Sequence, residues 1–286
     1  MDVTAVIDSD IAFGGDTRAR ISSQGGGAAA NVATWLAYLG EDVFLVSRVG
    51  DDFNGAALHA ELDLYKVNHS DKRVPGEKSG TVIVLVTADG ERTMFPDSAS
   101  NSGLSQEDLP QLDGFTAAYI SGYALINPQS RTNVQTMIGT LKSSGMKVIL
   151  DPGTVGALRN VPFSCIHEWI GLADILILNE EEALFIAQES DIERALITLA
   201  QSSPLVVVKR GSRGAIAIYD TVIISDIPTT PVNVIDTTGA GDSFAAGFIS
   251  EWFQSATLEA AIVRGAQQAR ICIESVGARP PIGKAK

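Results

Sequence analysis

Residues 236–244 read Asp-Thr-Thr-Gly-Ala-Gly-Asp-Ser-Phe, and this stretch decides the fold class. It follows a short apolar run at 232–235, which predicts a strand, and it leads into a predicted helix over 243–253. The large apolar residues of that helix recur every four positions and predict one buried stripe, formed by Phe244, Phe248 and Trp252. The turn is therefore predicted to lie where a strand gives way to a helix N-terminus.

Such a turn is suited to binding an anion. Gly239, Ala240 and Gly241 are expected to present backbone N–H groups that the helix leaves unpaired, with the positive end of the helix dipole behind them. Asp242 lies in the same turn and is placed to accept a proton from a hydroxyl that attacks a bound phosphate. The alternative interpretation is that Asp242 only complements the helix dipole.

The complete nonapeptide resembles the C-terminal signature of the ribokinase-like, or PfkB, family of carbohydrate kinases. Residues 25–40, Gly-Gly-Gly-Ala-Ala-Ala-Asn-Val-Ala-Thr-Trp-Leu-Ala-Tyr-Leu-Gly, resemble that family's N-terminal motif, and the likeness extends over nearly all 286 residues. The resemblance implies a single kinase domain over 1–286 of the α/β class, with a mostly parallel sheet between two layers of helices and a small β-sheet lid.

Short apolar runs alternate with helical stretches along the chain, as expected of a sheet covered by helices on both faces. Strands are predicted at Val43–Val46, Ala118–Ser121, Val148–Leu150, Ile175–Leu178 and Leu205–Val208. Helices are predicted at Ala28–Leu39, Asn54–Leu64, Arg131–Ser144, Glu181–Gln188, Ile192–Gln201, Ser243–Phe253 and Leu258–Ser275. Residues 3–24 and 80–95 interleave strand-forming and polar residues, which favours a lid with one wet face.

Composition narrows the class of protein. A chain of 286 residues with 45% hydrophobic content is long enough for one large core. It has no apolar run of about 18 residues and no basic-then-apolar leader, so we expect a cytoplasmic protein without a membrane span. A formal net charge of −13 argues against nucleic acid as a partner. The Gly-x-x-x-x-Gly-Lys-Ser/Thr motif is missing from the sequence, which excludes a P-loop enzyme.

The resemblance assigns residues to ATP and to Mg²⁺. Asn179 and Glu182 match the family's Asn-x-x-Glu motif, in which the Asn approaches the nucleotide phosphates and the Glu orders Mg²⁺ through water. An acidic first helical turn is the alternative. The loop after the strand at 205–208 resembles the family's ATP-contacting loop and supplies Lys209, Gly211, Ser212 and Gly214. A plain hairpin between Val208 and Ala215 competes with that interpretation.

A monovalent cation such as K⁺ is a further implied ligand. Asp236 and Thr238 match positions that hold such an ion in some family members, although the threonines at 237 and 238 could instead cap the helix.

The acceptor side of the site is implied by the N-terminal motif. Gly26, Gly27 and Asn31 match the residues that contact the sugar, with the glycines allowing close approach to the main chain. Family spacing favours Asp2 over Asp10 as the acidic sugar ligand, since Asp2 stands 29 residues before Asn31.

Three further residues are assigned around the acceptor. Tyr123 follows a predicted strand and either stacks on a ring or simply packs. Arg92 lies on the predicted lid and either reaches the acceptor and phosphate or is a solvated lid charge. Asn101 is expected to close the pocket, and the lid is expected to form the contact of a homodimer.

One part of the sequence departs from the family pattern. Asp2 should end the first core strand, which normally runs for several residues ahead of it, yet only Met1 precedes it here. We therefore expect either a gap in the sheet beside the strands leading to Ser121 and Val46 or another segment in that place. An unfilled gap would leave buried backbone groups unpaired and make the protein poorly stable.

The sequence thus predicts an ATP-dependent kinase that acts on a primary hydroxyl of a sugar or sugar-like molecule. Asp242 is the predicted base, the backbone at 239–241 is the predicted anion hole, and Mg²⁺ is the predicted metal. A nucleoside kinase, for pseudouridine or a purine nucleoside, is the alternative within enzymes. A catalytically weak ATP- or sugar-binding protein is the alternative from another class, suggested by the missing strand.

Overall fold

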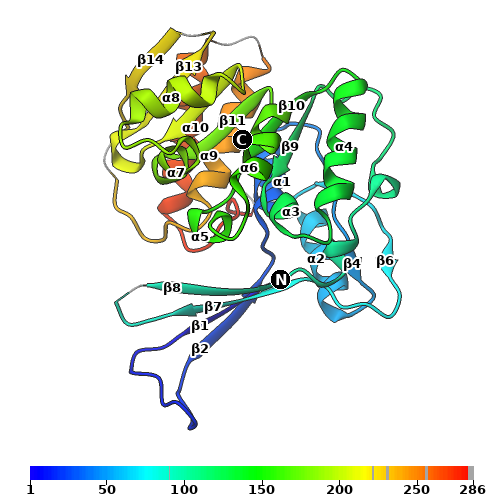
Figure 1. Ribbon diagram of the computed structural model, residues 1–286. Coiled ribbons are helices and arrows are strands. Elements are labelled where there is room, and N and C mark those ends of the chain that lie inside the picture. The colour runs from blue at the N-terminus through cyan, green and yellow to red at the C-terminus, as the bar shows by residue number, and fades with distance from the viewer. Residues whose placement is uncertain (90, 221, 230–231, 255–256, 283–286) are drawn as a thin grey trace.

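A computed structural model of the protein describes residues 1–89, 91–220, 222–229, 232–254 and 257–282 (Figure 1). Its main sheet has six strands in the order β14-β13-β12-β11-β10-β9. The four strands from β9 to β12 are parallel, and β13 and β14 are added antiparallel. The bounds are β9 Ala117–Ser121, β10 Lys147–Asp151, β11 Ile175–Asn179, β12 Leu205–Lys209, β13 Ala215–Tyr219 and β14 Val222–Ile227.

Helices cover both faces of this sheet because its central strands are apolar on both sides. The bounds are α1 Ala28–Tyr38, α2 Phe53–Leu64, α3 Tyr123–Ile126, α4 Arg131–Ser143, α5 Val155–Leu158, α6 Phe163–Leu172, α7 Glu180–Ala187, α8 Ile192–Ala200, α9 Ala240–Trp252 and α10 Leu258–Ile273. One core cluster joins the sheet to α4, α6, α7 and α8. A second joins the opposite face to α1, α9 and α10.

Alternation along single strands shows how the two faces are separated. In β11, Leu176 and Leu178 pack into the first cluster, whereas Ile175 and Ile177 pack into the second. The predicted three-layer α/β fold is therefore confirmed. Every helix predicted from the sequence is present, with ends that differ by at most a few residues.

A separate four-stranded sheet projects from this body, as Figure 1 shows below the helices. Its order is β2-β1-β7-β8, and the strands come from the two segments predicted to form the lid. The bounds are β1 Asp2–Val6, β2 Arg20–Gln24, β7 Thr81–Val86 and β8 Arg92–Asp97. We call these four strands the lid sheet. Residues along all of β2 and β8 are exposed, so one face of the lid sheet is free in this chain.

Short pairings complete the described structure. They are β3 Phe44–Leu45 with β5 Asn68–His69, and β4 Val49–Gly50 with β6 Arg73–Val74. Short 3₁₀ turns cover η1 Ala99–Gly103, η2 Gln106–Asp108 and η3 Gly211–Arg213.

The prediction of a strand at 232–235 is wrong. These residues are irregular, Val234 and Ile235 are exposed, and the Ile235 N–H donates to Ile273 O at the end of α10. A short apolar run has too little periodicity to separate a strand from an extended connection. The strand at the edge of the sheet beyond β13 is β14, which lies earlier in the chain than 232–235.

The expected place of Asp2 also needs correction. It was expected at the end of a core strand, but it opens β1 in the lid sheet, where β1 pairs with β2 and β7. The segment predicted as a strand at Val43–Val46 forms only β3 and does not pair with β9. Among the described residues, β9 pairs with β10 alone.

Candidate active site

The turn at 236–244 forms the N-terminus of α9, as predicted. Gly239 occupies the N-cap position in the left-handed region, with φ 77°. A Cβ there would also lie 2.5 Å from Ala278 Cα, so both the conformation and the space call for glycine. Asp242 follows in the first helical turn. The sequence therefore places a carboxylate in the first turn of α9, and within this turn the Ala240 N–H donates to Thr237 O at 3.2 Å.

Asp242 is held by a residue from the other motif. Asn31 Nδ2, on α1, donates a hydrogen bond of 2.8 Å to Asp242 Oδ2. Burial raises the pKa of Asp242 to about 7, although the hydrogen bond from Asn31 and the charge of Lys209 oppose that rise. Asn31 Oδ1 is buried without a hydrogen-bond partner in the structure. The pair thus combines a carboxyl group that titrates near neutrality with an unused acceptor.

Lys209 lies on the other side of the turn. Its Nζ is 3.0 Å from Asp151 Oδ2, and a Cβ built on Gly241 would lie 3.2 Å from the same Nζ. Burial alone would lower the pKa of Lys209, but the charges of Asp151 and Glu182 outweigh it and raise that pKa. The ammonium group therefore stays charged beside the turn at 236–244.

Asp151 was not predicted from the sequence. It ends β10, at the carboxyl edge of the parallel strands, where ligands of open α/β sheets bind. The only signal in the sequence was an acidic residue directly after a predicted buried strand. A single residue of this kind, outside any motif, is weak evidence for a functional site.

Asn179 and Glu182 form a complete capping box at the start of α7. Glu182 N–H donates to Asn179 Oδ1 at 2.9 Å, and Asn179 N–H donates to Glu182 Oε2 at 2.8 Å. The capping alternative therefore describes the local geometry well. Capping does not require burial, however, and Glu182 is only 4% exposed. Burial, followed by the charge of Asp151, raises the pKa of Glu182 to about 7, and a role of Glu182 toward Mg²⁺ stays a prediction.

The loop from Lys209 to Gly214 connects β12 to β13, so the hairpin alternative describes its path. A Cβ on Gly214 would overlap Ile227 O, so packing alone explains why this position is a glycine. Gly211 has φ 56° and open space around its Cα. Ser212 is exposed beside it. Contact of this loop with ATP stays a prediction.

Asp236 joins the main body to the lid sheet. Arg92 Nη2 donates to Asp236 Oδ1 at 2.6 Å, and this oxygen also accepts from the N–H and hydroxyl of Thr238. Gly277 N–H donates to the other oxygen at 3.0 Å. Burial would raise the pKa of Asp236, but these hydrogen bonds lower it. Arg92 is thus an ion-pair partner here, and the monovalent cation site at Asp236 and Thr238 stays a prediction.

The acceptor residues predicted from the sequence gather on one cavity of about 1820 Å³ between the lid sheet and the main body. They are Asp2, Gly26, Gly27, Asn31, Arg92, Asn101, Tyr123 and Asp242, and Gly239, which was predicted for the anion hole and for ATP, lines the same cavity. Thr238 lines it as well. The residues predicted for ATP lie outside its lining, apart from Gly239. Asp242 and Gly239 therefore stand where the two groups of residues meet.

Contacts within the cavity refine three predictions. A Cβ on Gly26 would lie 2.1 Å from the carboxyl atoms of Asp2, so a glycine at this position leaves the space that the Asp2 carboxyl group occupies. Asn101 Oδ1 accepts from Arg48 N–H at 3.0 Å, which gives Asn101 a structural use. Tyr123 is 46% exposed.

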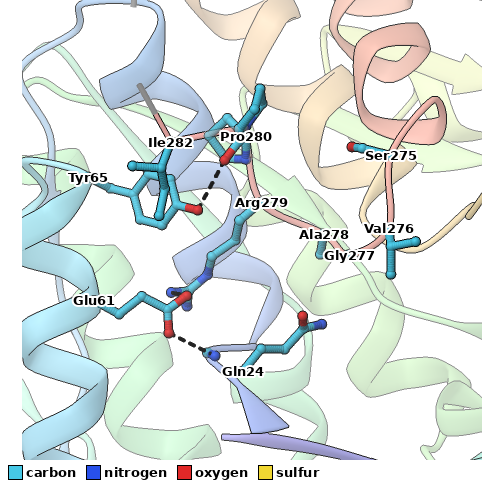
Figure 2. A pocket seen from close by; sticks show the side chains of 12 residues that line it. Gln24, Glu61, Tyr65, Ser275, Val276, Gly277, Ala278, Arg279, Pro280 and Ile282 are labelled. Atoms are coloured by element: carbon cyan, nitrogen blue, oxygen red, sulfur yellow. Dashed lines mark hydrogen bonds and ion pairs between the residues drawn. The ribbon is translucent and has the colours of Figure 1, made fainter. Parts of the chain in front are cut away.

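A smaller cavity of about 370 Å³ adjoins the loop that carries Gly26 (Figure 2). Glu61 Oε2 accepts from Gly25 N–H at 2.8 Å, and Glu61 Oε1 lies 2.6 Å from Arg279 Nη1. Figure 2 shows Tyr65 donating to Pro280 O, at 3.0 Å. The C-terminal segment and α2 thus hold the backbone at Gly25, where the loop that carries Gly26 and Gly27 begins. No sequence motif pointed to these residues.

The fold and the site are those of an α/β kinase, with a carboxylate and a glycine turn at one edge of a parallel sheet and a lid sheet beside them. The chain belongs to the pfkB family of carbohydrate kinases, whose family model matches residues 6–285.

Relatives within the family act on different acceptors, as their names state. The chain is 32% identical to a fructokinase from Klebsiella pneumoniae, over 82% of this chain and 79% of that protein. It is 28% identical to a cytidine kinase from Thermococcus kodakarensis, over 88% of each. A crystal structure of fructokinase from Vibrio cholerae, bound to fructose, ADP and calcium, superposes with a TM-score of 0.78, at 26% identity, covering 97% of this chain and 92% of that one.

Within the described residues, no helix is both long and apolar enough to span a membrane.

Proposed function

We propose that this kinase transfers the terminal phosphate of ATP to a primary hydroxyl of a sugar, with fructose the first acceptor to test. The hydrogen bond from Asn31 to Asp242 carries the proposal, because it joins the acceptor motif to the anion-binding turn in one site. The fructokinase relative, at 32% identity, supports a sugar of this kind.

Asp242 is the proposed general base. It takes the proton of the attacking hydroxyl as the hydroxyl oxygen bonds to the terminal phosphorus, while the bond from that phosphorus to the bridging oxygen breaks and ADP leaves. Its pKa of about 7 is close to neutral pH, where about half of the carboxyl groups are ionised and able to accept a proton. The N–H groups at 239–241 stabilise the charge on the transferred phosphoryl group.

The ATP phosphates are proposed to lie along the edge formed by Asn179, Lys209 and the turn at 239–241. Lys209 supplies a buried positive charge next to that turn. Glu182 is the proposed outer ligand of Mg²⁺, and the ion, when bound, neutralises charge on the nucleotide phosphates. The exposed part of the 209–214 loop, which contains Gly211 and Ser212, is proposed to contact the adenosine part of the nucleotide.

The sugar is proposed to bind between Asp2, the glycines at 26 and 27, and Asn31. Asn31 Oδ1 has no hydrogen-bond partner among the described residues and can accept from a sugar hydroxyl. Arg92 is proposed to act on the site by tying the lid sheet to Asp236. A K⁺ ion beside Asp236 and Thr238 is the associated cation proposal.

A nucleoside is the second candidate acceptor. A relative at 28% identity over 88% of each chain is a cytidine kinase. Tyr123, 46% exposed on the cavity wall, offers a ring on which a base can stack.

The lid sheet is the proposed contact of a homodimer. Strand alternation places Ile21, Ile83 and Phe95 on the face away from the cavity, and they are 70%, 43% and 56% exposed. An exposed apolar sheet face of this kind is typical of an interface. Light scattering of the protein and its Ile83→Lys variant tests the proposal, since the variant should be monomeric.

An ADP-release assay over ATP with fructose, other hexoses, ribose and nucleosides tests the function. Turnover with a sugar, at a kcat/KM at least tenfold above that with any nucleoside, supports the sugar kinase. The reverse ratio supports the nucleoside kinase. ADP release that no acceptor raises above the acceptor-free rate would favour a protein that binds ATP or sugar with little catalysis.

A further inference from the structure

Residues 277–280, which follow α10, contact both halves of the candidate site. They run from the turn at 236–244 to the loop at 25–27, which we call the acceptor loop. We call residues 277–280 the strap, and Figure 2 shows them beside the small cavity. The strap makes contacts with Asp236, Gly239, Trp35, Glu61 and Tyr65.

One end of the strap lies on the phosphate side of the site. Gly277 N–H donates to Asp236 Oδ2 at 3.0 Å, and Gly277 has φ 97°, a conformation that favours glycine. Ala278 packs against the N-cap of α9, because a Cβ on Gly239 would lie 2.5 Å from Ala278 Cα. Trp35 Nε1, on α1, donates to Ala278 O at 2.9 Å. The first half of the strap is therefore fixed to the proposed anion hole.

The other end of the strap lies behind the acceptor loop. Arg279 Nη1 is 2.6 Å from Glu61 Oε1, and Gly25 N–H donates to Glu61 Oε2 at 2.8 Å. A side chain on Gly25 would overlap both the Arg279 guanidinium and the Glu61 carboxylate. Tyr65 supports this end, since its hydroxyl donates to Pro280 O at 3.0 Å and its ring lies 6.0 Å from the guanidinium carbon. The acceptor loop is thus held at its first residue by the Glu61–Arg279 pair.

The Glu61–Arg279 pair is not what stability alone would favour. The Arg279 side chain is 7% exposed and that of Glu61 is 26% exposed, so both charged groups give up much of their hydration. Arg279 Nε is buried with no hydrogen-bond partner among the described residues, which adds a further cost. An apolar pair of similar volume would fill the space without these costs. We therefore interpret the pair by the geometry that it imposes on the loop.

That geometry reaches the residues assigned to the acceptor. Gly26 lies against the Asp2 carboxyl group, where a Cβ would overlap it. Gly27 is the N-cap of α1, and its carbonyl oxygen accepts from the Asn31 N–H at 2.9 Å. A shift of the backbone at Gly25 is therefore passed on to both contacts. Misplacing a reacting group by about 1 Å can cost about 10²-fold in rate.

We infer that Glu61 and Arg279 are positioning residues for phosphoryl transfer: through the strap they fix the acceptor loop relative to the turn at 239–241. The inference rests on the proposed function, which places the acceptor at this loop and the phosphate at that turn. Arg279 lines both cavities and forms part of the wall between them. Among the described residues that line the large cavity Glu61 is absent, so it acts through Gly25 and not by touching the acceptor.

Kinetics with ATP and fructose test the inference in two single variants and their combination. Glu61→Gln removes the charge but keeps an oxygen for the Gly25 N–H, and Arg279→Met removes the charge at similar length. Each should raise the KM for fructose and lower kcat, by about tenfold each, while ATP affinity measured by calorimetry stays within twofold. The double variant should lose no more than the worse single variant, because one pair carries the effect.

Two further variants serve as controls. Arg270→Met makes the same change in an exposed ion pair with Glu274 and should leave kcat and both KM values unchanged. Arg279→Lys keeps the positive charge and should recover part of the loss. A pair with a purely structural role would reduce the active fraction, which lowers kcat and leaves the KM for fructose unchanged. That result, or losses that multiply in the double variant, would overturn the inference.

Hydrogen exchange gives a readout that needs no acceptor. In Arg279→Met, the amides of Gly25 and Asn31 should exchange at least tenfold faster, although neither loses its hydrogen-bond partner, while the amide of Phe248 within α9 keeps its rate. Unchanged rates at Gly25 and Asn31, or an equal acceleration at Phe248, would overturn the inference. If Arg279→Met does not fold, Glu61→Gln is carried through the same measurement at Asn31. Absence of turnover with fructose in the wild type counts against the proposed function alone, and the exchange rates then decide the inference.

Discussion

Lys209 Nζ lies 3.0 Å from Asp151 Oδ2, and both side chains are largely buried, at 15% and 16% exposed. The two residues end β12 and β10, the strands on either side of β11, and the pair places a positive charge beside the turn at 239–241. Such a pair costs desolvation energy, so we interpret it as positioning the ammonium group for phosphate.

The first prediction tests this pair. Asp151→Asn removes the carboxylate charge while keeping the side chain's shape, so Lys209 loses its anchor. We expect kcat/KM for ATP to fall about 10- to 100-fold. Glu274→Gln is the matched control, because it breaks an exposed ion pair with Arg270 and should leave the kinetics unchanged. Wild-type kinetics in a folded Asp151→Asn protein would contradict the positioning role.

The second prediction concerns the proposed base. Asp242→Asn keeps the size of the side chain and removes its ability to take a proton, so kcat should fall about 10²- to 10⁴-fold. ATP affinity, measured by calorimetry, should change little. If the variant retains more than a tenth of the wild-type kcat, Asp242 is not the base.

The third prediction is a pH profile. The folded-state pKa of Asp242 is raised from 3.8 to about 7, chiefly by burial, so the carboxyl group holds its proton at acid pH and cannot act as a base there. We expect kcat/KM for the acceptor to rise about tenfold per pH unit below about 7 and to level off above it. Saturating Mg²⁺ keeps Glu182 ionised, so that its own titration does not add to the slope. A rate independent of pH from 5 to 8 would be the contrary result.

Much of the fold could be predicted because its signals are local. The nonapeptide places a glycine turn at a helix N-terminus, and the periodicity of α1, α4 and α10 marks helices without reference to the rest of the chain. Asn31 and Asp242 were both predicted, although their contact, between residues 211 positions apart, was implied only by the family resemblance.

The remaining features depend on contacts distant in sequence. Asp151 gains its importance from Lys209, 58 residues later, and the pairing of Glu61 with Arg279 is set by packing of the C-terminal segment on α2. Whether β1 joins the core or the lid sheet depends on which edge it pairs with, and composition does not decide that.

The fourth prediction concerns the anion hole. Gly241→Val places a branched side chain beside Lys209 Nζ, since even a Cβ there would lie 3.2 Å from it. The KM for ATP should rise and kcat should fall together, each by about tenfold or more. Gly139→Val is the control, because Gly139 is an exposed helical residue whose Cβ would meet nothing within 4 Å. Unaltered ATP kinetics in the folded Gly241 variant would remove this turn from the mechanism.

The last prediction separates Asp2 from Asp10 as the acidic ligand of the acceptor. Asp2 lies on the cavity wall against Gly26, and burial raises its pKa, whereas Asp10 is exposed in the connection between β1 and β2. A carboxylate that accepts hydrogen bonds from sugar hydroxyls contributes most when it is shielded from water. Asp2→Asn should therefore raise the KM for the acceptor about 10- to 100-fold while leaving the KM for ATP within twofold, and Asp10→Asn should change neither. Acceptor titrations of both variants at saturating ATP provide the measurement. An Asp2 variant with a normal acceptor KM, or an equal loss in the Asp10 variant, would show that Asp2 does not bind the acceptor.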